Sequence, residues 1–199
     1  MAEEAKPAAP IQSSAPAPAV SAAAAPEAAP VPAPPALPDW AQAVRAASPE
    51  GIVAVLGLPG GDGAADVPTF EIQPEHWFAV VATVKMQGFT AFTDLTAVDH
   101  PERSPRCDVV LHLRDLREGR LVRCRTRVGE SDALASIEPL FAGAGWPERE
   151  VFDLFGVRFN GNADLRRLML PDDWQGHPLR RDYPLIGPRA LDPDGPYAV

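Results

Sequence analysis

Side chains that could ligate a metal ion stand close together near the C-terminus. The set is Asp172, Asp173 and His177, with Glu150 or Asp153 earlier in the chain. Carboxylate and imidazole ligands of this kind would fit a free-standing metal-dependent hydrolase. Metal ligands normally project from rigid elements, whereas Gly176, Pro178 and Pro184 interrupt this segment. Arg180 and Arg181 would also pair with the acids and disfavour a cation, so the same residues need a second interpretation.

Arginines, acids and aromatic residues crowd together between residues 146 and 185, which hold six of the sixteen arginines. Arginine and aromatic side chains recur in protein interfaces, because a planar guanidinium both stacks on rings and binds carboxylates bidentately. We therefore predict a docking segment whose interface candidates are Glu148, Arg149, Glu150, Asp153, Asp164, Arg166, Arg167, Trp174, His177, Arg180, Arg181, Asp182 and Tyr183. The alternative is that these charges pair within the chain and fasten the segment to its own domain. Both arrangements can hold together.

The local pattern of this segment predicts a short helix followed by an arm. Pro147 suits a first helical turn, where its missing N–H costs nothing, and Gly156 suits a left-handed helix end. Residues 157–159 favour a brief extended segment, and Asn160-Gly161 is a strong turn signal. Beyond that turn we predict an extended, irregular C-terminal arm.

The elements upstream follow from hydrophobic periodicity. Helices are predicted from Asp39, as N-cap, to residue 47, at 74–87, and at 131–141 with Ser131 as cap. Strands are predicted at 52–58, 69–72, 89–98, 108–113 and 121–128, the last two forming a hairpin around Gly119. The pattern indicates an α+β, two-layer domain with a mainly antiparallel sheet and helices on one face.

Composition divides the chain into three parts. Residues 1–38 are rich in alanine and proline and poor in large apolar side chains, so we expect a disordered tail and not a signal peptide. Residues 39–159 form the predicted α+β domain, and residues 160–199 form the predicted docking arm.

Charge and composition also exclude several classes of function. A net charge of −9 argues against a general binder of nucleic acid or anionic membranes. The two cysteines, Cys107 and Cys124, form no C-x-x-C pair, so the chain alone builds no iron–sulfur cluster. No apolar run reaches the roughly 20 residues that a transmembrane helix needs.

Three arginines alternate along one predicted strand, at Arg123, Arg125 and Arg127. A charged, solvated strand edge that discourages aggregation is one explanation, and contact with an acidic protein is another. Binding of RNA is a third, but no aromatic stacking platform alternates with these arginines.

Three blocks of the C-terminal segment resemble a known family. EREVFDLFG, then DLRR, then GHPLRRDYPL occur in the order found in the 30-kDa-type subunit of respiratory complex I, the C subunit of bacterial NADH–quinone oxidoreductase. A weaker likeness runs through residues 70–145, including GFTAFTDLTAVDH. The family usually carries His-Pro where this chain has Asn162-Ala163, so one turn departs from the pattern.

The resemblance implies a non-catalytic subunit of an assembly that passes electrons from NADH to quinone and pumps protons. It implies that FMN and iron–sulfur clusters lie in partner subunits, and that this chain binds no cofactor or metal. The 49-kDa-type subunit, known as the D subunit in bacteria, is the implied main partner. The B and I subunits are implied to lie nearby, in a hetero-oligomer at the cytoplasmic face of the inner membrane. An equivalent subunit of a membrane-bound hydrogenase, or of an F420H2- or ferredoxin-driven complex, is the alternative.

Overall fold

The computed structural model describes residues 37–57 and 67–184 of the 199-residue chain. Most of the predicted N-terminal tail and residues 185–199 of the predicted arm therefore lie outside the described residues. Two residues assigned to the tail are described, and they join the folded part. Leu37 packs against the hydrophobic core, and the Pro38 carbonyl accepts hydrogen bonds from the first helix.

A five-stranded sheet forms the centre of the folded part. Its strands are β1 (Ile52–Leu56), β2 (Thr69–Ile72), β3 (Ala91–Asp99), β4 (Cys107–Arg114) and β5 (Leu121–Val128). Their order is β1-β2-β5-β4-β3, and every pairing is antiparallel except β2 with β5. β4 and β5 form the predicted hairpin, in which Leu111 lies opposite Cys124 and Gly119 takes a positive φ of 70°. The sheet is mainly antiparallel, as predicted.

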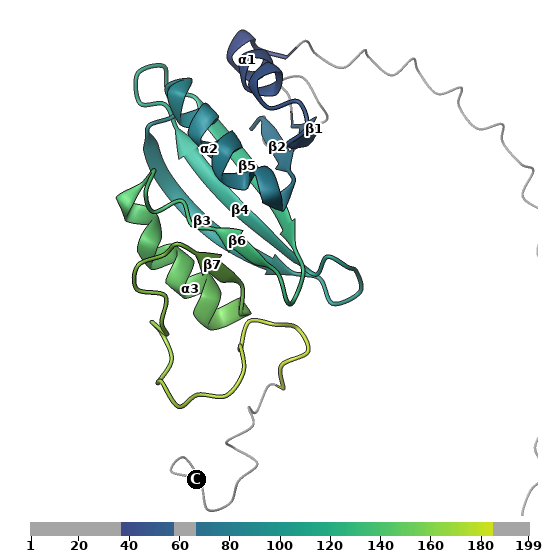
Figure 1. Cartoon of the computed structure of the whole chain (residues 1–199), viewed down its shortest axis with the longest axis vertical. Helices are drawn as coiled ribbons and strands as arrows, with labels where there is room; N and C mark the ends of the chain where they lie inside the picture. Colours follow the sequence, from purple (N-terminus) through teal and green to yellow (C-terminus); the bar gives the residue numbers. More distant parts are fainter. Residues whose placement is uncertain (1–36, 58–66, 185–199) are drawn as a thin grey trace, which may run out of the picture. The chain divides into compact units, whose positions relative to one another are not determined.

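The helices lie on one face of this sheet (Figure 1). They are α1 (Asp39–Ala47), α2 (Trp77–Met86), preceded by the 3-10 turn η1 (Pro74–His76), and α3 (Gly145–Phe155), preceded by η2 (Ala142–Ala144). Strand alternation places Val109, Leu111 and Val122 in the core beneath them, because successive side chains point to opposite faces. The predicted two-layer α+β fold is confirmed.

Two details of the predicted helices are wrong. The N-cap of α1 is Pro38, not Asp39, and no side chain caps the helix. The helix expected at 131–141 does not form, because residues 133–135 form strand β6, which pairs in parallel with β7 (Arg158–Asn160). The backbone N–H of Ile137 then donates to the Glu148 carboxylate instead of continuing a helix. Long-range pairing outweighs the local helical signal here.

The arginine-bearing strand β5 is internal, so the explanation as a strand edge is wrong. β5 lies between β2 and β4. Its arginines alternate with the buried Val122, Cys124 and Val128, so they lie on the face of the sheet opposite the core. Arg125 and Arg127 pair with Glu71, and Arg123 donates to His112. No helix within residues 37–57 or 67–184 is long and apolar enough to cross a membrane.

Candidate functional site

Residues 161–184 follow β7, and we call them the arm. The arm runs beside α3 without regular secondary structure (Figure 1). Gly156 ends α3 with a positive φ of 82°, as predicted, and Gly161 opens the arm in a turn with φ of 95°. Asn160 is the last residue of β7, next to the predicted start of the arm. The arm is irregular, but its residues are extensively bonded to the domain.

Glu148 sits at the base of the arm and is fully buried on α3. Its carboxylate accepts hydrogen bonds from Ser136 Oγ at 2.7 Å, Ile137 N at 2.7 Å and Asn162 Nδ2 at 2.9 Å. Burial raises the pKa of Glu148 above its usual range, and these donors oppose the rise only in part. The Asn162 amide thus makes a specific contact at the turn where the chain departs from the family pattern.

Asp153 is fully buried on the same helix and holds the next part of the arm. One carboxylate oxygen accepts hydrogen bonds from three consecutive backbone N–H groups, those of Leu168, Met169 and Leu170, at 2.8–3.0 Å. The other oxygen accepts a hydrogen bond from Arg167 Nη1 at 2.6 Å. Burial alone would raise the pKa of Asp153, but the backbone donors and Arg167 together lower it. We call these five residues the Asp153 cluster.

Arg149 binds the part of the arm that lies between the contacts of Glu148 and those of Asp153, namely residues 164–167. The Arg149 guanidinium donates to the carbonyls of Arg166 and Arg167 at 3.2 and 3.0 Å and to Asp164 at 3.2 Å. Arg166 is exposed and its Nε donates to Asp164 at 2.8 Å. The guanidinium of Arg149 also lies 5.7 Å from the ring of Trp146. Arg149 therefore has all three nitrogens occupied within its own chain.

The end of α3 is bound by His177 and Arg180. His177 Nδ1 lies 2.9 Å from the Asp153 carbonyl, and Arg180 Nε donates to the Phe155 carbonyl at 2.7 Å. A Cβ at Gly156 would lie 2.6 Å from Arg180 Nη2 and 2.7 Å from His177 Cδ2, so a glycine is required for this close approach. Burial lowers the pKa of His177, and the nearby arginines add to the effect.

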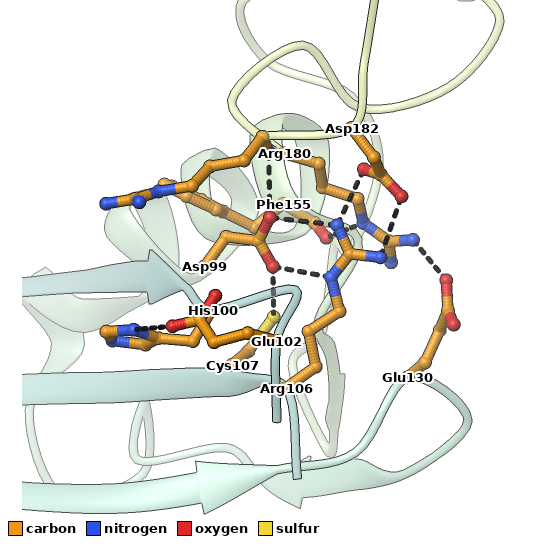
Figure 2. Close-up of polar contacts among 10 residues, drawn as sticks. Asp99, His100, Glu102, Arg106, Cys107, Glu130, Phe155, Arg180 and Asp182 are labelled. Atoms are coloured by element: carbon orange, nitrogen blue, oxygen red, sulfur yellow. Dashed lines mark hydrogen bonds and ion pairs between the residues drawn. The ribbon is translucent and has the colours of Figure 1, made fainter. Parts of the chain in front are cut away.

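The far part of the arm is held at Asp99, the last residue of β3 (Figure 2). Arg106 donates to both Asp99 oxygens, at 2.5 and 2.9 Å, and to both Asp182 oxygens, at 2.9 and 2.6 Å. The Arg181 N–H donates to Asp99 at 2.8 Å. These contacts lower the pKa of Asp99, chiefly through Arg106. We call Asp99, Arg106, Arg181 and Asp182 the Asp99 cluster.

Arg180 adds a further tie close to the Asp99 cluster. Its Nη1 donates to Glu130 at 2.5 Å, and Figure 2 shows this pair beside Arg106 and Asp182. Glu130 follows β5, so Arg180 connects the end of α3 to the loop beyond the sheet. The structure thus brings together most of the sequence-predicted residues by pairing them with their own domain.

The remaining interface candidates, Glu150, Arg181, Trp174 and Tyr183, contribute fewer side-chain contacts to the attachment of the arm. Glu150 is exposed and makes no side-chain hydrogen bond or ion pair to described residues, and the same holds for the side chain of Arg181. Trp174 is half-buried and its carbonyl accepts Arg167, while the Tyr183 hydroxyl donates to the Gln175 carbonyl at 3.0 Å.

The geometry gives no support to the hydrolase alternative. Among the described residues, no group of three or more His, Cys, Asp or Glu side chains is placed to hold a metal ion. Asp153 already accepts four donors from the arm, and His177 binds a backbone carbonyl. The Asp153 carboxylate would have to give up those contacts to bind a cation.

Sequence reasoning missed several residues outside the segment that hold it, among them Asp99, Arg106, Glu130, Ser136 and Glu138. One signal was present for Asp99. Leu95, Ala97 and Asp99 alternate on the core face of β3, and a carboxylate at a core position needs partners.

The fold and these contacts define an α+β domain whose ionisable residues bind its own arm. A family model described as the 30 kDa subunit of respiratory-chain NADH dehydrogenase matches residues 70–189. The chain therefore belongs to the family of 30 kDa subunits of respiratory-chain NADH dehydrogenase, which confirms the resemblance seen in its sequence.

Individual relatives agree with this assignment. The C subunit of NADH-quinone oxidoreductase from Ruegeria sp. strain TM1040 is 37% identical over 154 residues, covering 76% of this chain and 74% of the relative. The C subunit from Jannaschia sp. strain CCS1 is 48% identical over 99 residues, which span 50% of this chain and 48% of the relative. A solved structure of a trypsin-resistant fragment (1–134) of Nqo5 is 27% identical, with a TM-score of 0.53, and covers 62% of this chain and 97% of the fragment.

Proposed function

We propose that this chain is a structural, non-catalytic subunit of an NADH–quinone oxidoreductase and contributes a docking arm to it. Membership of the 30 kDa subunit family is the observation that carries the proposal. Electrons pass from NADH through FMN and iron–sulfur clusters to quinone, coupled to proton translocation, and these cofactors lie in partner subunits. The described residues of this chain serve to hold an arm.

The proposed main partner is the 49-kDa-type subunit, with the B and I subunits nearby, at the cytoplasmic face of the inner membrane. The contacts of the arm support a docking role in one respect. Asp153 and Asp99 bind backbone N–H groups of the arm, so its conformation is largely set before a partner arrives. Preorganisation of this kind reduces the conformational entropy lost on association.

The test is copurification of the tagged full-length chain from detergent-solubilised membranes. We expect the unaltered chain to retain the 49-kDa-type subunit and NADH–quinone reductase activity. Arg181→Ala should lower the amount of the 49-kDa-type subunit retained, because this exposed side chain makes no hydrogen bond or ion pair to the described residues. Arg114→Ala is the matched control, an exposed arginine at the end of β4. An unaltered chain that retains no subunit of the oxidoreductase would overturn the proposal.

A further inference from the structure

The charged residues of the docking segment are largely engaged inside the chain. Arg149 uses all three guanidinium nitrogens, Arg167 uses both Nη atoms, and Arg180 uses Nε and Nη1. A partner that recruited these arginines would first have to break existing bonds to Asp153 or to backbone carbonyls. Exchanging one charged hydrogen bond for another gains little free energy. The ionic residues are therefore poor candidates for the main contact.

Large apolar side chains of the same segment are exposed instead. Trp146 on α3 is 67% exposed, Met169 65% and Leu179 51% in the described part of the chain. The two aromatic interface candidates from the sequence, Trp174 and Tyr183, are half-buried. Tryptophan is enriched among the residues that dominate binding energy, and methionine is enriched at interfaces.

Each exposed apolar side chain stands on a backbone that the domain holds in place. Trp146 lies in the first turn of α3 beside the Arg149 guanidinium. The Met169 N–H donates to Asp153 at 2.8 Å, and the Leu179 N–H donates to the Leu154 carbonyl at 3.1 Å. Apolar side chains on a fixed backbone lose less entropy on binding than those on a mobile loop.

We propose that Trp146, Met169 and Leu179 form the main contact of this segment with an apolar surface on another subunit of the oxidoreductase, with a partner carboxylate facing Arg181. The inference rests on the proposed function, because family membership supplies the partner. Charge supports the choice of a protein over a lipid surface: the chain carries −9 and would be repelled by anionic headgroups. The Arg181 side chain, exposed and without an ion pair among the described residues, supplies the complementary positive charge.

The experiment compares two sets of alanine variants of the tagged full-length chain. The test variant is Trp146→Ala/Met169→Ala/Leu179→Ala. The control is Met86→Ala/Leu116→Ala, because these side chains are 76% and 71% exposed but lie outside α3 and the arm. Thermal unfolding midpoints should match the unaltered chain in both, since exposed side chains contribute little to stability. The readout is the ratio of retained oxidoreductase subunits to tagged chain after detergent solubilisation.

We expect the test variant to retain at least about tenfold less partner than the control, as loss of several interface anchors should give. We also expect the unaltered chain to keep its partner in a wash of about 1 M salt, where the screening length falls to about 3 Å and exposed ion pairs weaken. Equal retention by test and control variants, while the unaltered chain binds its partner, would overturn this inference and leave the proposed function standing. No partner on the unaltered chain would overturn the proposed function itself.

Two other occupants are distinguished by the purified chain alone. Binding of the unaltered chain, but not the test variant, to phosphatidylcholine–phosphatidylglycerol vesicles would assign the surface to lipid and overturn the inference. A concentration-dependent dimer that the test variant abolishes would assign it to a second copy and overturn it as well. An unaltered chain that stays monomeric and does not bind the vesicles would support the inference.

Discussion

The arm is held by two buried aspartates that obtain their hydrogen bonds from different places. Asp153 accepts four donors, and all four belong to the arm, at Arg167 and residues 168–170. Asp99 accepts four donors, of which two come from Arg106 and one, at 3.9 Å, from Cys107 Sγ in its own domain, and only one from the arm, the Arg181 N–H. Arg106 itself contacts the arm through two hydrogen bonds to Asp182, whose side chain is 58% exposed.

This difference indicates that the arm is fastened unequally along its length. The Asp153 cluster ties a carboxylate directly to consecutive peptide groups, so the near part of the arm cannot leave without exposing a buried charge. The Asp99 cluster holds the far part mainly through Arg106 and an exposed ion pair, and such pairs contribute little in water. We therefore expect the arm to open from its far end.

The largest predicted effect follows from removing the carboxylate of the Asp153 cluster. Asp153→Ala leaves the half-buried Arg167 and three backbone N–H groups without their acceptor. Loss of one partner of a buried charged pair should lower the free energy of unfolding by about 3–5 kcal/mol. Urea unfolding of the full-length chain measures the change.

Glu150→Ala is the matched control, on the same helix and exposed. We expect it to change the free energy of unfolding by less than about 0.5 kcal/mol. Equal losses in Asp153→Ala and Glu150→Ala would show that the contacts of Asp153 do not stabilise the fold.

A second substitution tests whether the far part opens independently. Asp99→Ala removes the acceptor of the Arg181 N–H, but Arg106 keeps its bonds to Asp182, so we expect a smaller loss of about 2–3 kcal/mol. Hydrogen exchange should quicken at the Arg181 amide while residues 168–170 keep their protection. Faster exchange at both places would mean that the two clusters open together.

The sequence supported prediction of the fold better than of the clusters, for a physical reason. Strand alternation and helical spacing report burial directly, and β2 and β5 were placed within their observed bounds. The segment containing Arg167 and Asp153 was identified from its composition. The hydrogen-bond partners of Asp153 could not be predicted from the sequence. Apart from Arg167 they are backbone N–H groups, which every residue except proline carries. Position in space, not residue type, selects those at residues 168–170.

The dependence of stability on pH separates the aspartates from Glu148. Lowered pKa values of Asp99 and Asp153 mean that their contribution is present above the unfolded-state pKa, about 3.9, and is lost as pH falls through the folded-state values. The raised pKa of Glu148 acts oppositely, since its contribution is complete below the unfolded-state pKa, about 4.3, and declines as pH rises.

We therefore predict that the free energy of unfolding falls less steeply with decreasing pH in Asp153→Asn than in the unaltered chain. Urea unfolding at a series of pH values below about 4 measures this slope. Asp132→Asn serves as a control, because Asp132 is exposed and lies in the loop between β5 and β6. An unchanged acid slope in Asp153→Asn would mean that the carboxylate titrates alike in the folded and unfolded chain.

The smallest predicted effect concerns the exposed end of the Asp99 cluster. Asp182→Ala removes the acceptor of two Arg106 hydrogen bonds, but Arg106 keeps both bonds to the buried Asp99. The free energy of unfolding should fall by only about 0.2–1 kcal/mol, as for other exposed ion pairs. Exchange at the Tyr183 amide, which donates to the Arg180 carbonyl, should still quicken because this stretch loses its tie to Arg106. A loss as large as that in Asp99→Ala would reverse the ranking within this cluster, since it would place the main hold on the arm in the exposed pair and not in the buried carboxylate.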